Sequence, residues 1–275
     1  MDNYVVLIIV GFLIGSLGTL IGAGGGFLLV PLLIIIHPEL SPEIITAISI
    51  AIVGCNAISG SVAYARLKRI DYKAGLLFAA FTIPGSIAGV YTTQYIPKMI
   101  FNIFFGVLLI LLAFFLFRQK PAAVGGPVLS VDRKNWKTHT LTDKAGDTYQ
   151  YSYNQGIGIF ISIIVGYLSP VLGIGGGIIH VPALVNWLRF PVLIATATSH
   201  LILAVMATVS VIVHILNGNY DDPYVLRMVI GLGIGVIAGA QLGAFLSHKI
   251  SGNTIIRALA VCLGLVGLRI LLTGF

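Results

Sequence analysis

The sequence predicts an all-α polytopic membrane protein built from two inverted structural repeats, each containing a re-entrant or discontinuous helix broken by glycine. Three observations support this fold class: the composition, the lengths of the apolar runs, and a glycine-rich motif that occurs twice. Of the 275 residues, 57% are hydrophobic and only 9% are charged. A soluble domain carries about 25% charged residues. Most of the surface is therefore expected to face lipid.

The apolar runs are the first element of the prediction. A helix needs about 20 apolar residues to cross the hydrocarbon core. The first and fifth runs are too long for one helix and too short for two ordinary ones, and each has a glycine cluster near its middle. We expect two broken or re-entrant segments there and single helices elsewhere. The runs cover residues 4–36, 44–65, 74–96, 99–117, 156–188, 192–216, 224–247 and 254–273.

A hydrophilic segment separates the two groups of runs. Within it, the stretches 136–143 and 147–153 alternate between polar and apolar residues around a glycine turn, which predicts a small cytoplasmic β-hairpin. The chain then divides into a first transmembrane repeat at 1–117, this loop at 118–154, and a second transmembrane repeat at 155–275.

The internal repeat is the strongest signal. A frame of G-x6-G-x-G-G-G-x3-V-P-x-L begins at Gly15 and again at Gly166. Two further pairs of matching blocks follow in the same order at an offset of about 150 residues, which indicates that the halves share ancestry. These blocks are Thr46-Ala-Ile-Ser49 with Thr196-Ala-Thr-Ser199, and Gly85-Ser-Ile-Ala-Gly89 with Gly235-Val-Ile-Ala-Gly239.

Loop charge predicts how the halves are oriented. The loop at 66–73 is strongly basic and is expected on the cytoplasmic side, which puts 37–43 outside and 118–154 inside. Its counterpart in the second half, 217–224, has two acidic residues and no Lys or Arg, so we expect it outside. The halves are therefore predicted to be inverted relative to each other.

The two glycine clusters form the core of the candidate binding site. Unpaired backbone groups at membrane depth are tolerated only where protein buries them or where they line a wet cavity. Free amides at a helix N-terminus favour an anion, and glycine lets a ligand approach the main chain. The alternative is that glycine only permits close helix packing. We expect an anion site near the midplane that uses the main chain of Gly22, Gly24, Gly25, Gly26, Gly173, Gly175, Gly176 and Gly177.

Polar side chains beside the clusters complete this site. All nine acidic residues lie in terminal or loop positions, which argues against a cation carrier and leaves an anion or a neutral substrate. Neutral donors are available from Ser49, Asn56, Ser199 and His200, and the spacing of seven places Ser49 and Asn56 on one helix face. His200 is also a candidate for binding a coupled proton. The alternative for each is an ordinary interhelical hydrogen bond.

Several classes are excluded or disfavoured. The net charge of +7 is concentrated in loops, as on the cytoplasmic face of a membrane protein, so we expect no nucleic-acid partner. Both cysteines lie in apolar runs, and no metal or cofactor is expected. The sequence lacks H-E-x-x-H, G-x-S-x-G and Walker motifs, so we expect neither an enzyme nor a catalytic residue. Tyr64 and Tyr95 are expected as anchors at the membrane interface.

The glycine-proline frames, which extend to Pro31 and Pro182, together with the Thr-Ala-x-Ser tetrads and the hydrophilic central loop, resemble the TauE/SafE family of sulfite and organosulfonate exporters. The resemblance covers nearly the whole chain. It implies a permease of the plasma (inner) membrane that exports small sulfur-containing anions. We therefore expect a multi-pass secondary transporter with alternating access around a midplane site. A passive small-anion channel and a permease for another small organic anion remain the alternatives.

Overall fold

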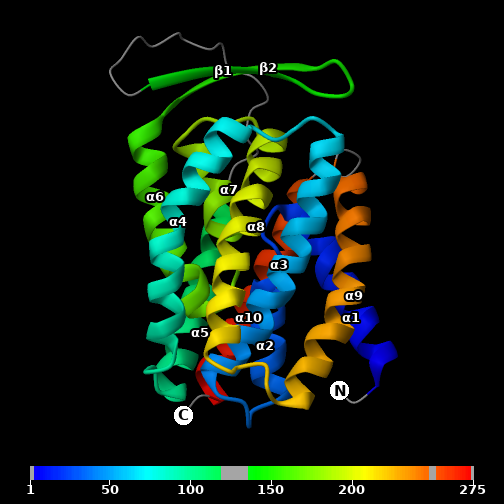
Figure 1. Cartoon of the computed structure of the whole chain (residues 1–275), viewed down its shortest axis with the longest axis vertical. Coiled ribbons are helices and arrows are strands. Elements are labelled where there is room, and N and C mark those ends of the chain that lie inside the picture. The colour runs from blue at the N-terminus through cyan, green and yellow to red at the C-terminus, as the bar shows by residue number, and fades with distance from the viewer. Residues whose placement is uncertain (1–2, 119–135, 248–251, 274–275) are drawn as a thin grey trace.

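The computed structural model describes residues 3–118, 136–247 and 252–273. These residues form a bundle of helices, with a two-stranded hairpin lying across one end (Figure 1). The first half comprises α1 (Tyr4–Ile21), α2 (Gly26–Ile36), α3 (Pro42–Arg66), α4 (Tyr72–Thr93) and α5 (Lys98–Arg118). The second half follows the hairpin of β1 (Trp136–Thr142) and β2 (Thr148–Asn154), and comprises α6 (Gln155–Leu172), α7 (Gly177–Asn186), α8 (Val192–Leu216), α9 (Pro223–Leu246) and α10 (Gly252–Thr273).

Short polar capping residues set where the helices begin. Ser41 accepts a hydrogen bond from the amide of Ile44, and the following residue is a proline at the first helical position of α3. Asp71 caps α4 in the same way through the amide of Ala74. Such caps satisfy amides that have no partner inside the helix. The observed helices therefore begin close to the boundaries that the apolar runs predicted.

Both long apolar runs are broken, as the sequence predicted. In each, an 18-residue helix (α1 or α6) is followed by a glycine turn and a shorter helix (α2 or α7). In Figure 1, α1 starts at the end of the bundle away from the hairpin, and the loop after α2 lies at that same end. The loop after α7 lies at the hairpin end, where the ring of Phe190 is 4.5 Å from that of Tyr151. The two segments are thus re-entrant from opposite ends.

Within the described residues, six helices are long and apolar enough to cross a membrane, namely α1, α3, α4, α6, α8 and α9. Hydrophobic side chains also cover the outside of the bundle, as expected of a protein whose solvent is lipid. The fold class predicted from composition is confirmed: the chain is mostly helical, with one small antiparallel hairpin.

The main helix pairs each join one helix of the first half to one helix of the second half. Helix α1 packs on α9, and its counterpart α6 packs on α4, while α3 packs on α8 and α5 on α10. Glycines permit the close approach: a methyl group on Gly239 would lie 2.2 Å from the carbonyl oxygen of Phe12, and one on Gly89 would lie 2.6 Å from that of Tyr167. This pairing is what a two-fold relation between the halves would produce. The inverted repeat remains a prediction that the packing supports.

The hairpin is tied to the loop between α3 and α4. Arg69 forms an ion pair with Asp143 at 3.1 Å, and both side chains are nearly inaccessible to solvent. The carboxylate of Asp71 accepts hydrogen bonds from Tyr151 at 2.7 Å and from His139 at 2.5 Å. Burial, and then the adjacent Asp71 carboxylate, raise the pKa of the Tyr151 hydroxyl, which therefore stays protonated and donating at neutral pH. The hairpin and the basic loop thus lie on one side of the bundle.

Candidate anion site at the glycine breaks

The backbone at each break adopts a conformation that favours glycine. Gly25 precedes α2 with a φ of 88°, and Gly176 precedes α7 with a φ of 43°, both in the left-handed region. Other residues pay a steric penalty there, whereas glycine does not. Every residue of both breaks is buried. The breaks are therefore interior features, and they do not face lipid.

The two breaks lie directly against each other. A methyl group on Gly26 would be 2.3 Å from the carbonyl oxygen of Gly173. In the other direction, a methyl group on Gly177 would be 2.3 Å from the carbonyl oxygen of Gly22. Each break thus occupies the space beside the other, and the main chains of the two halves meet inside the bundle without side chains between them.

Several amides at the breaks have no protein acceptor. Among the described residues, none accepts from the amides of Gly25, Gly26 and Phe27, where α2 begins. The same holds for Gly176 and Ile178 at the start of α7. The first amides of a helix lack intrahelical partners, and the helix dipole places partial positive charge there. Two such N-termini, brought together in a buried region, form a local environment that favours an anion.

A serine from each half binds the break of the other half. The Ser49 hydroxyl, from α3, donates to the carbonyl oxygen of Gly173 at 2.5 Å. The Ser199 hydroxyl, from α8, donates to the carbonyl oxygen of Gly22 at 3.4 Å. These residues are equivalent in the repeat, so the same hydrogen bond is made twice, once from each half to the other. The serines satisfy carbonyl groups that would otherwise be unpaired in a buried region.

Asn56 forms hydrogen bonds at the first break. Its side-chain amide donates to the carbonyl oxygen of Gly24 at 2.8 Å, while its oxygen accepts from the hydroxyl of Thr19. The position equivalent to Asn56 in the second half is Met206, a fully buried apolar residue. The first break therefore carries a polar network that the second lacks.

His200 lies next to this network and does not contact the breaks. Its Nδ1 is 3.1 Å from the carbonyl oxygen of Thr196, and its Nε2 is buried without a hydrogen-bond partner. The ring packs edge-on against Tyr64, with centroids 5.3 Å apart, and a methyl group on Gly60 would meet both His200 and Thr19. His200 thus lies beside Thr19, which in turn bonds Asn56.

The structure brings together eleven of the predicted residues and places the twelfth, His200, beside them. It also adds Thr19 and Tyr64, which sequence reasoning missed as site residues. The expectation that Tyr64 anchors the membrane interface is wrong: its side chain is 1% exposed, and its hydroxyl donates to the carbonyl oxygen of Thr19 at 3.0 Å. Tyr95, by contrast, is 82% exposed. A tyrosine near a helix end carries no sequence signal that separates these two roles.

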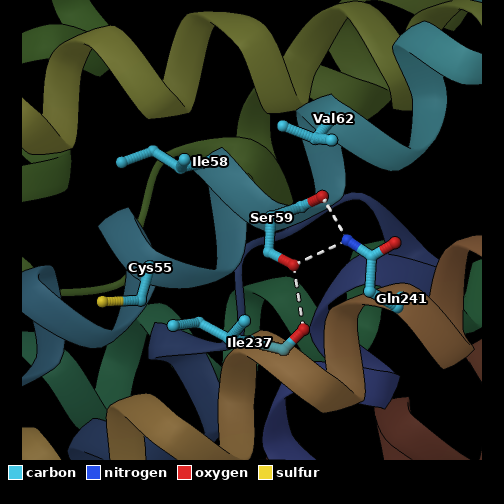
Figure 2. Close-up of a pocket in the computed structure, with 6 residues that line it drawn as sticks. All are labelled: Cys55, Ile58, Ser59, Val62, Ile237 and Gln241. Atoms are coloured by element: carbon cyan, nitrogen blue, oxygen red, sulfur yellow. Dashed lines mark hydrogen bonds between the residues drawn. The ribbon is translucent and has the colours of Figure 1, made fainter.

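A separate hollow lies on the outside of the bundle, between α3 and α9. Figure 2 shows the Gln241 side chain donating to the carbonyl oxygen and the hydroxyl of Ser59, each at 2.8 Å, while that hydroxyl donates to the carbonyl oxygen of Ile237. None of the predicted site residues lines this groove, and most of its surface is apolar. It suits a lipid chain better than an anion. Its volume is about 300 Å³, and it is lined by Cys55, Ile58, Ser59, Val62, Ile237 and Gln241.

Comparisons with known proteins agree with this architecture. A family model described as sulfite exporter TauE/SafE matches residues 7–270. The probable membrane transporter protein YunE of Bacillus subtilis is 31% identical over 278 residues, which cover 99% of this chain and 98% of that protein. A probable membrane transporter protein of Methanocaldococcus jannaschii is 27% identical over 277 residues, which cover 97% and 94% of the two chains. No solved structure matches.

Proposed function

We propose that this chain, which belongs to the TauE/SafE family of membrane transporters, is a secondary transporter that exports small sulfur-containing anions such as sulfite or organosulfonates. The family is one of membrane transporters, the relatives are described as probable membrane transporters, and the chain is a multi-pass membrane protein. The substrate, the direction and alternating access are the parts that we propose. In this mechanism, the two halves rock around the anion held between the glycine breaks.

One observation carries the proposal: two helix N-termini with unpaired amides meet inside the bundle, where no carboxylate of the described residues lies. Main-chain amides bind an oxyanion without a fixed positive charge, which also lets the anion leave. The hydroxyls of Ser49 and Ser199 are available to the anion if the halves separate and their present acceptors move away. The eight cluster glycines, Asn56 and His200 are the other residues that we propose around the substrate.

Charge distribution supports an orientation with the hairpin in the cytoplasm. The basic loop at 66–73 lies against the hairpin, and Arg189 lies near Trp136 of β1, with 6.0 Å from its guanidinium carbon to the ring centroid. At the opposite end, the segments 37–43 and 217–224 carry four acids, with Lys98 near the first of them; the acids are Glu39, Glu43, Asp221 and Asp222. Under the positive-inside rule, the hairpin end faces the cytoplasm of a cell whose plasma (inner) membrane holds the protein.

Flux into sealed vesicles tests the proposal. Purified protein reconstituted into liposomes is expected to carry radiolabelled sulfite or methanesulfonate at a rate that saturates with substrate and exceeds that of protein-free vesicles. Folding is checked separately by thermal unfolding in detergent. Folded protein that carries neither sulfite nor any sulfonate contradicts the proposed substrate class.

The same assay separates the carrier from the two alternatives. A passive channel gives flux that does not saturate and is not accelerated by unlabelled substrate on the opposite side. A carrier saturates and shows exchange, because the loaded site returns faster than the empty one. A permease for another organic anion gives saturable flux of a carboxylate such as acetate but none of sulfite.

A further inference from the structure

A hydrogen-bonded chain links the two halves at the end opposite the hairpin. The side-chain amide of Asn219, in the loop between α8 and α9, donates to the Glu43 carboxylate at 2.6 Å. The oxygen of the same side chain lies 3.0 Å from Nδ1 of His214. Glu43 belongs to the first turn of α3, and His214 to the last turn of α8. In Figure 1, the loop that carries Asn219 lies at the end of the bundle away from the hairpin.

The chemistry of this chain fixes which nitrogen of His214 carries the proton. An ionised carboxylate only accepts, so Asn219 must turn its amino group toward Glu43 and its oxygen toward the imidazole. Nδ1 must then donate, which leaves the lone pair of the neutral ring on Nε2. Nε2 is buried and has no hydrogen-bond partner among the residues that the structure describes. The ring thus presents a free acceptor nitrogen, and its other nitrogen is connected through one amide to a negative charge.

We propose that Nε2 of His214 is the binding site for a coupling proton, and that Glu43, acting through Asn219, stabilises the imidazolium that forms. The inference rests on the proposed transport function, because a proton can drive an anion only if the protein carries both. In this respect His214 differs from the other two buried histidines in α7 and α8. His180 contacts Ser162 at 3.4 Å and His200 contacts a carbonyl oxygen, and neither is linked to a carboxylate.

Other titratable groups lie around this hydrogen-bonded chain, but none of them takes the role of Glu43. The Tyr220 ring lies edge-on to His214, with centroids 6.3 Å apart, and its hydroxyl donates to the carbonyl oxygen of Ala47. Its pKa is raised mainly by burial, so it stays neutral. His37 pairs with Glu39 at 2.9 Å and reaches Tyr224 of α9. The remaining acids of this end, which add negative potential, are Asp221 and Asp222.

Protonation of His214 is expected to change the balance between the closed and open states of this end. The imidazolium has a second N–H, on Nε2, for which the described structure provides no acceptor. A buried donor without a partner is destabilising, and more so when the group is charged. Water or the anion can accept this hydrogen bond once the helices separate. Proton binding therefore shifts the balance between the closed and open states, which is the linkage that coupling requires.

Two measurements on the intact protein test the proposal. The first is flux of methanesulfonate, which stays fully ionised over this range, in liposomes with the same pH on both sides, measured across the neutral range. We expect the wild-type rate to depend on pH and the rate of His214→Gln to be flat. Glu43→Gln keeps an acceptor for Asn219 but removes the charge, so its pH profile should move to lower pH. His180→Gln, which removes another buried histidine, should keep the wild-type profile.

The second measurement does not depend on transport. Imidazole NMR signals of the purified protein, assigned with His214→Gln, should show His214 titrating, with a midpoint that falls in Glu43→Gln. A His214 signal that does not titrate while the protein stays folded overturns the proposal, as does a wild-type flux profile in His214→Gln. Absence of sulfite and sulfonate flux in the wild type, with His214 titrating as expected, counts against the proposed substrate and leaves the proton site standing.

Discussion

Replacing Gly177 by alanine tests whether contact between the breaks matters for transport. Gly177 does not adopt a left-handed conformation, so the added methyl group acts through its size alone. It would lie 2.3 Å from the carbonyl oxygen of Gly22 and 2.8 Å from the Cα of Ala23. Ordinary contact begins near 3.4 Å, so the two main chains must move apart by roughly 1 Å. Overpacking of this kind costs about 1–3 kcal/mol.

Saturable sulfite flux in liposomes is the assay, with thermal unfolding as the check on folding. We expect Gly177→Ala to lose roughly tenfold or more in rate, equal to about 1.4 kcal/mol, because the displaced amides no longer converge on one anion. The matched control is Gly54→Ala in α3, where the methyl group would make an ordinary contact of 3.5 Å with Ala207. The reasoning is refuted if Gly177→Ala and Gly54→Ala both transport like the wild type.

Two further variants test the local chemistry. Asn56→Ala leaves the Gly24 carbonyl and the Thr19 hydroxyl without their partner, and should lower the free energy of unfolding by about 1–3 kcal/mol, seen as a lower melting temperature; an unchanged value contradicts the assigned hydrogen bonds. At Asp143, burial raises the pKa, but hydrogen bonds from Arg69 and from two main-chain amides outweigh it and lower the pKa below its ordinary value of 3.8. A carboxyl group whose pKa is lowered on folding stabilises the folded state at pH values above its ordinary pKa. This stabilisation is lost as the pH falls through the pKa of the folded state. Hairpin docking, followed by Trp136 fluorescence, should therefore be weaker in Asp143→Asn than in the wild type at pH 7, and the difference should vanish on acidification.

Much of the fold could be predicted because the lipid bilayer restricts which segment lengths and backbone structures can cross it. The glycine-broken runs could be predicted as re-entrant because they are the wrong length for whole crossings, and the structure breaks both at the clusters. The hairpin followed from alternation around Gly146. The spacing of Ser49 and Asn56 placed them on one face, and the structure shows each bonding a glycine carbonyl at a break. In these cases one local rule was enough.

Contacts between distant segments could not be predicted from one sequence. Nothing in the loop charges showed that Arg69 would pair with Asp143, because a basic loop reads the same whether its charges are solvated or paired. The link between Glu43 and Asn219 spans 176 positions of sequence, and neither residue belongs to a recognisable motif. His200 was expected at the anion site, yet it packs on Tyr64. Such pairings depend on how helices are rotated against each other, which periodicity alone does not determine.

Hydrogen bonds join the halves at both ends of the bundle, and their positions bear on the proposed transport mechanism. At the hairpin end, the Thr198 hydroxyl accepts from the amide of Asp71, and at the opposite end Asn219 binds Glu43. A net hydrogen bond contributes about 0.5–1.5 kcal/mol, and one to a charged group about 1.5–3 kcal/mol. In the proposed mechanism, opening an end must break the bonds of that end, which at the end opposite the hairpin also include those of Tyr220 with Ala47 and of Tyr224 with His37. The serine bonds at the breaks lie between the two ends, and in the proposed mechanism opening one end leaves the hydrogen bonds of the other end in place.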